Sequence, residues 1–68
     1  MYNIYYSTSK FARTILYENI DTFGKAKENL IREFNRLMYQ GIICYWISNV
    51  SFVGKVQGIE TTFYIKKK

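Results

Sequence analysis

Three features of this sequence predict an α+β fold with two layers and the element order ββαββ. Apolar residues recur every three or four positions between residues 21 and 40, which is the spacing of one helix face. Stretches rich in β-branched and aromatic residues lie on both sides of that segment, as in strands. No proline-rich or linker-like stretch interrupts the chain. We therefore expect a single domain, residues 1–68, with a four-stranded, mainly antiparallel sheet and one amphipathic helix on one face.

The first two strands are expected at residues 1–6 and 11–20, joined by a polar turn at residues 7–10. A hairpin centred on this turn places Arg13 opposite Ile4, on the otherwise apolar face, where the guanidinium would reach water along apolar surface. The opposite face is expected to carry six other side chains: Asn3, Tyr5, Ala12, Thr14, Leu16 and Glu18.

The helix is expected over residues 21–40. Asp21 or Thr22 can cap its start by accepting a hydrogen bond from a free backbone N–H, and Gly41 fits its end. The apolar face comprises Phe23, Ala26, Leu30, Ile31, Phe34, Leu37 and Met38. The polar face comprises Lys25, Glu28, Asn29, Arg32, Glu33 and Arg36.

The last two strands are expected at residues 42–52 and 56–65, with a two-residue turn at Gly54-Lys55. The register set by this turn pairs Trp46 with Phe63, Cys44 with Ile65, and Val50 with Ile59 on the side toward the helix. On the other side it pairs Tyr45 with Tyr64, Asn49 with Glu60, and Ile47 with Thr62. The residues predicted to pack against the helix are Ile42, Cys44, Trp46, Val50, Ile59, Phe63 and Ile65.

The residues available for chemistry are few. The chain has no histidine, one cysteine and five acidic residues, so neither a general acid–base pair nor a metal-binding cluster is evident. The single cysteine, Cys44, lies in an apolar run and is expected to be a buried thiol. We therefore expect a non-enzymatic protein without a cofactor.

Aromatic and basic residues instead favour binding. The chain has a net charge of +5 and seven tyrosines. The predicted register gathers tyrosines on the uncovered sheet face, beside an apolar residue and several lysines: Tyr5, Tyr45, Tyr64, Ile47, Lys55, Lys66, Lys67 and Lys68. Such a face suits docking on another protein, stacking of single-stranded nucleic acid, or a homodimer. The polar helix face with Lys25, Arg32 and Arg36 is the second candidate surface.

The stretch Ile20-Asp21-Thr22-Phe23, through Ala26, Leu30 and Phe34 to Gly41-Ile42, resembles short ββαββ proteins of phage and prophage early regions. This group includes anti-CRISPR proteins and other counter-defence inhibitors. The resemblance implies an inhibitor that docks on a larger host protein or ribonucleoprotein. It transfers no site residue.

Targeting signals are not apparent in the sequence. No apolar run approaches the roughly 18 residues of a membrane span. Residues 1–20 lack the basic start and apolar centre of a signal peptide. We therefore expect a cytoplasmic protein with no membrane partner.

Overall fold

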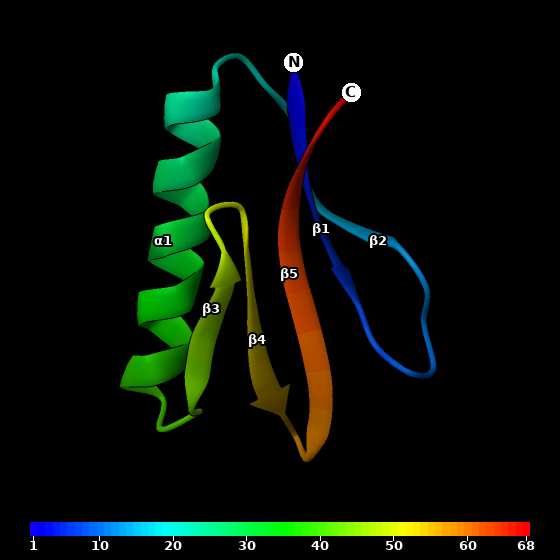
Figure 1. The fold of residues 1–68 in the computed structure, drawn as a ribbon, viewed down its shortest axis with the longest axis vertical. Coiled ribbons are helices and arrows are strands. Elements are labelled where there is room, and N and C mark those ends of the chain that lie inside the picture. Colours follow the sequence, from blue (N-terminus) through cyan, green and yellow to red (C-terminus); the bar gives the residue numbers. More distant parts are fainter.

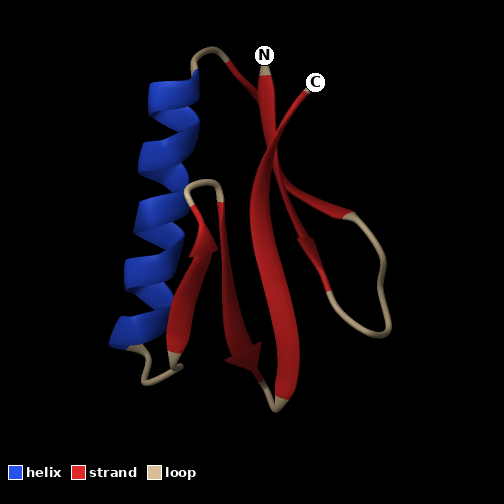
Figure 2. Cartoon of the chain, viewed as in Figure 1, coloured by secondary structure: helices blue, strands red, loops and turns tan.

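The computed structural model describes residues 1–68 as two layers, a five-stranded sheet and one helix (Figures 1 and 2). The elements along the chain are β1 (Tyr2–Ser7), β2 (Thr14–Ile20), α1 (Phe23–Tyr39), β3 (Cys44–Ser48), β4 (Ser51–Val56) and β5 (Ile59–Lys67). All neighbouring strands are antiparallel, in the order β2-β1-β5-β4-β3, so β2 and β3 are the two edges. The predicted α+β class is confirmed, but the predicted count of four strands is wrong.

The additional strand arises because the predicted strand 42–52 is broken by a turn. The chain reverses at Asn49-Val50, where the Ser48 hydroxyl accepts a hydrogen bond from the Val50 N–H and contacts the Ser51 hydroxyl. Short polar side chains that bond to nearby backbone favour such reversals. β3 therefore pairs with β4, and Val50 lies in the turn instead of in a strand.

The predicted turn at Gly54-Lys55 is also wrong, because both residues lie inside β4. Gly54 is a packing glycine: a Cβ there would lie 2.7 Å from Sγ of Cys44 on the neighbouring strand. The true turn is Gln57-Gly58, whose φ angles of 52° and 78° are those of a tight hairpin turn with two left-handed residues.

These two corrections change the strand partners. Trp46 lies opposite Phe52, Cys44 opposite Gly54, and Tyr45 opposite Val53, so none of the three pairs with its predicted partner on β5. On β5, Ile59 faces Val56, Glu60 faces Lys55, Thr62 faces Val53, and Phe63 faces Phe52. The predicted pairs of Val50 with Ile59, Asn49 with Glu60 and Ile47 with Thr62 are therefore also wrong.

The first hairpin has a longer loop than predicted. Tyr6 lies opposite Thr14, so residues 8–13 form the connection and Arg13 precedes the strand instead of facing Ile4. The β1–β2 pairing also has two register shifts, at each of which β2 contains an extra residue. As a result Leu16 packs against the core, although the sequence placed it on the opposite face.

The helix begins and ends close to the predicted positions. The Thr22 hydroxyl accepts a hydrogen bond from the Lys25 N–H at 3.2 Å, so Thr22 is the N-cap and not Asp21. Gly41 follows the C-cap Gln40 with φ 87°, a left-handed conformation that glycine adopts without strain. Glu33, predicted on the polar face, is instead one of four buried helix residues, with Ala26, Leu30 and Leu37.

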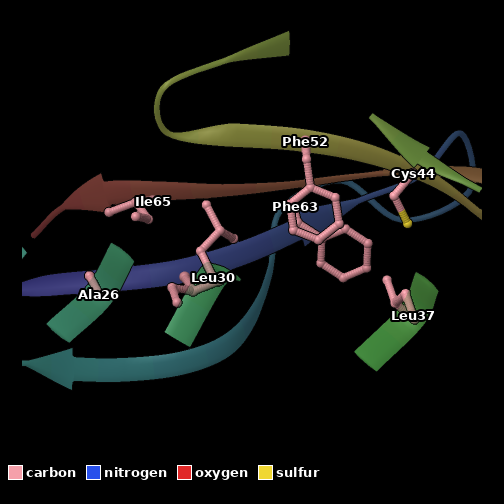
Figure 3. Close-up of a cluster of buried hydrophobic side chains, with 8 residues drawn as sticks. Ala26, Leu30, Leu37, Cys44, Phe52, Phe63 and Ile65 are labelled. Carbon is pink, nitrogen blue, oxygen red and sulfur yellow. The ribbon is translucent and has the colours of Figure 1, made fainter. Parts of the chain in front are cut away.

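The core lies between α1 and the sheet (Figure 3). Its centre is Phe52, which is fully buried and stacks on Phe63 with ring centroids 4.8 Å apart. Cys44, Phe63 and Ile65 are buried there as predicted. Of the other residues predicted against the helix, Ile42 and Val50 pack only at its margin and Ile59 is half-buried, while Trp46 remains 37% exposed.

The two chain ends lie side by side (Figure 1), and the Lys68 N–H donates to the Met1 carbonyl. β5 continues to Lys67, so the terminal lysines extend a paired strand. No helix in the structure is long and apolar enough to cross a membrane.

Candidate functional site

The predicted tyrosine cluster divides into two parts. Tyr5 and Tyr64 face each other on β1 and β5, and their rings stack with centroids 5.5 Å apart. Tyr45 lies on the edge strand β3, opposite Val53 of β4, so a whole strand separates it from β5. Tyr5, Tyr45 and Tyr64 therefore do not form one continuous surface.

The Tyr5–Tyr64 pair is largely closed. Tyr5 is only 9% exposed, and its hydroxyl accepts a hydrogen bond from Asn3 Nδ2 at 3.0 Å. The Arg13 guanidinium lies 5.4 Å from the centre of the Tyr5 ring. Because Tyr64 and Arg13 both cover the Tyr5 ring, this ring is occupied by contacts within the chain.

The predicted basic residues are also dispersed. Lys55 lies opposite Glu60 near the β4–β5 turn. Lys66 and Lys67 are exposed at the other end of β5, and Lys68 Nζ donates to Asn19 Oδ1 at 2.6 Å. Lys55 therefore lies near the start of β5, whereas the three terminal lysines lie near its end.

Exposed apolar side chains gather instead around β3, one of the two edges of the sheet. We define the β3 surface as six residues from α1, the α1–β3 connection and β3: Ile31, Met38, Ile43, Tyr45, Trp46 and Ile47. Their exposed fractions run from 37% for Trp46 to 79% for Ile43. The predicted site residues Tyr45 and Ile47 belong to it, and both are 54% exposed.

A groove runs between the helix and this edge. It is lined by Ile31 and Phe34 of α1 and by Trp46 of β3. Trp46 stacks on Phe34 with centroids 5.1 Å apart. Lys27 closes one end, because its Nζ lies 4.4 Å from the centre of the Trp46 ring and donates to the Asn49 carbonyl. Its other lining residues, Asn35, Ser48 and Asn49, are polar, so the groove joins an apolar wall to a polar one with one cation at its rim.

The β3 edge directs backbone groups away from β4. The Cys44 N–H points away from β4 toward Met38 Sδ, at 3.3 Å. Because orientation alternates along an antiparallel strand, the backbone groups of Trp46 point outward as well. A thioether is a weak acceptor, so the Cys44 N–H remains available to a better partner. The edge can accept another strand.

The two sheet edges differ in protection. β2 carries two register shifts, the exposed Glu18 and the left-handed Asn19, which together interrupt a regular edge. β3 lies within residues 41–54, a stretch without any Asp, Glu, Lys or Arg. A shift at Ile47 disturbs only its last part, next to the turn. β3 is thus the edge open to pairing.

Four members of the β3 surface are not among the predicted site residues: Ile31, Met38, Ile43 and Trp46. The spacing of Ile31, Met38 and Trp46 matches the helix face or the strand face and therefore predicts core positions. The signal that marks this region is the absence of charge across residues 41–54, together with the turn-forming Asn49.

The chain offers little for catalysis or metal binding. No group of three or more His, Cys, Asp or Glu side chains lies close enough to hold a metal ion. Cys44 is buried, and burial raises the pKa of its thiol, which lowers the fraction of reactive thiolate at neutral pH.

Among the family models, curated proteins and solved structures compared with this chain, none matches it.

Proposed function

We propose that this chain is a non-enzymatic binding protein that docks on a larger protein through the β3 surface. The observation that supports this most is the row of exposed apolar side chains along an uncharged edge strand, whose outward Cys44 N–H has only a thioether as its acceptor. Soluble proteins commonly protect such edges with charges, bulges or proline, because an open apolar edge pairs with other chains. A partner that covers the edge accounts for its lack of protection.

The mode of binding follows from the edge geometry. A partner segment can add a strand beside β3, using the outward groups of Cys44 and Trp46 for hydrogen bonds. Tyr45 and Ile47 would contact it on one side of the sheet, and Trp46 on the helix side. Tyr and Trp combine large apolar area with a polar atom, which suits the centre of an interface.

The resemblance to phage early-region proteins supports a host protein or ribonucleoprotein as the partner. In this proposal the chain acts in the bacterial cytoplasm as an inhibitor of the anti-CRISPR type, blocking its target by occupancy. In this proposal the β3 surface acts by binding alone.

The test uses a tagged chain in a nuclease-treated bacterial lysate. We expect the wild type to retain a specific protein that the double variant Tyr45→Ala with Ile47→Ala loses. Interface aromatic residues of this kind contribute about 2 kcal/mol each. The matched control is Phe11→Ala with Ile15→Ala, which removes two apolar side chains, 62% and 50% exposed, away from β3.

Two outcomes would contradict the proposal. If both double variants retain the protein equally, the β3 surface is not the docking site, and the helix face with Lys25, Arg32 and Arg36 becomes the candidate. If nuclease removes all bound material, the partner is nucleic acid.

Nucleic-acid binding is the second candidate. Tyr64 is half-buried on the uncovered sheet face with the exposed Lys66 two residues away, and the chain carries a net charge of +5. A base stacked on Tyr64 with phosphates near Lys66 would give affinity that falls steeply with salt.

A homodimer through β3 is the third candidate function. Light scattering on the purified chain distinguishes it by the mass of the particle.

A further inference from the structure

A second cavity lies between the C-terminal half of α1 and the end of the sheet that carries the β4–β5 turn. Its volume is about 320 Å³, which is at the lower end for small-molecule pockets. The walls are mainly apolar and come from both layers: Tyr6, Leu16, Leu37, Val56, Ile59 and Phe63. Figure 3 shows two of them, Leu37 on the helix and Phe63 on the sheet. No residue of this cavity belongs to the β3 surface.

A buried carboxylate lines this cavity. Glu33 occupies the helix stripe that faces the sheet, between Leu30 and Leu37, and its side chain is only 6% exposed. Its one hydrogen-bonding partner is Arg36, which donates from Nε at 3.3 Å and from Nη2. A charged residue in an otherwise apolar stripe departs from the pattern expected for a core, and such departures occur at functional sites.

The ion pair leaves part of the guanidinium free. A guanidinium has five N–H donors, and the Nε–Nη2 edge of Arg36 is taken by Glu33. Nη1 has no hydrogen-bond partner in the chain, and the side chain is 54% exposed at the cavity rim. Glu33 therefore holds Arg36 in position while the outer edge of the guanidinium remains available to a second anion.

The charge balance favours an anionic ligand. Glu33 is already neutralised by Arg36, and the chain as a whole carries +5, so a cation would be repelled. The Glu33 hydrogen bond also raises the pKa of Arg36, which keeps the guanidinium charged under all ordinary conditions.

We propose that this cavity binds a small amphipathic monocarboxylate, with its apolar body among Leu16, Leu37 and Phe63 and its carboxylate on the free edge of Arg36. The size of the cavity limits the ligand to a medium-chain or single-ring acid. This site is separate from the proposed docking function, because none of its residues belongs to the β3 surface, although Leu37 and Met38 are neighbours in the sequence.

The experiment titrates the intact chain with decanoate by calorimetry and by amide chemical-shift mapping. We expect saturable 1:1 binding, with shifts at Leu37 and Phe63 and none at Tyr45. Decyltrimethylammonium and 1-decanol, which share the apolar chain, should each bind at least about tenfold more weakly, because they lack the charge-assisted hydrogen bonds.

Variants identify the two parts of the site. Arg36→Gln should weaken decanoate about tenfold or more, whereas Arg32→Gln, which removes the same charge one turn away, should not. Since Arg36→Gln leaves Glu33 buried without its partner, Val56→Phe provides a second test that fills the cavity with the ion pair intact. It should also abolish binding. Equal affinity for the three ligands, equal effects of the two arginine variants, or no saturable binding of decanoate would each overturn the proposal.

Discussion

At Gly54 the packing of the sheet leaves no room for a side chain. A Cβ at this position would lie 2.7 Å from Cys44 Sγ, so the buried thiol would have to rotate or the edge strand β3 to shift. Gly54→Ala should therefore destabilise the fold by about 1–3 kcal/mol, the usual cost of overpacking a core. Urea denaturation of the purified variant measures this change.

Gly24→Ala is the matched control for that substitution. Gly24 lies in the first turn of α1, and the nearest atom to its added Cβ is the Thr22 hydroxyl at 3.9 Å. Alanine should stabilise this helix position by up to about 1 kcal/mol. If both variants lose stability equally, the close approach of Gly54 to Cys44 is wrong.

The buried Cys44 thiol makes stability depend on pH. Burial raises the pKa of this thiol, so the unfolded chain loses its proton at lower pH than the native chain does. The free energy of unfolding is therefore unaffected below the ordinary thiol pKa, and it falls as pH rises from there to the raised native pKa.

Comparison with Cys44→Ala isolates this effect, since the other titrating groups are common to both proteins. The stability of the wild type relative to the variant should decline across the alkaline range that starts at the ordinary thiol pKa of about 8.5. A difference that stays constant over this range would show that the thiol is not buried.

Single residues explain where sequence reasoning succeeded and failed. The burial of Cys44 was predicted correctly, although the same uncharged run also contains the exposed Tyr45 and Ile47, so the run alone does not distinguish core from edge. Gly54 was misassigned, because the sequence gives no sign that a glycine serves packing and not a turn. Glu33 was misassigned for a similar reason: a carboxylate in the buried stripe is held there by Arg36, a contact that helical spacing alone does not reveal.

At the level of elements, α1 was predicted within two residues at each end, since its period and caps are local features. The strands after it were harder. The true β4–β5 pairing differs from the predicted one by an even number of residues, which preserves the faces of Phe63 and Ile65 while changing every partner. Pairing depends on which turn forms, and three candidate turns lie within ten residues of one another.

Phe52 should be the residue on which the packing of this hairpin depends most. It is fully buried and contacts the rings of Phe34, Trp46 and Phe63. Phe52→Ala should cost about 3–5 kcal/mol, a large part of the stability of a domain of this size.

Trp46→Ala should cost less, about 1–2 kcal/mol, because 37% of the residue is already exposed to solvent. Thermal melts of the two variants under identical conditions compare them. An equal loss from both would place Trp46 in the core, as the sequence suggested, and would remove it from the β3 surface.

At the scale of the whole molecule, charged residues are separated along the sequence from the segment that forms β3, although Lys27 of α1 packs on its Trp46 ring. All ten basic residues lie outside residues 41–54, which contain β3. The uncharged edge therefore belongs to a strongly basic protein whose copies repel each other at low salt. The lack of charge over residues 41–54 is visible in the sequence. The exposure of β3 is not, because it depends on the order of strands in the sheet, which contacts between distant parts of the chain determine.

This separation predicts the sign of a salt effect. Without a partner, the β3 edges of two copies can pair, and the opposing force is repulsion between net charges of +5. Added salt screens that repulsion, so self-association measured by sedimentation velocity should increase with ionic strength.

Ile43→Lys should suppress this self-association by placing a charge beside the β3 edge. Phe11→Lys, with the same net charge but a change in the β1–β2 loop, should reduce it far less. Self-association that decreases with salt, or that both lysine variants suppress equally, would mean that charged surfaces and not the β3 edge bring the copies together.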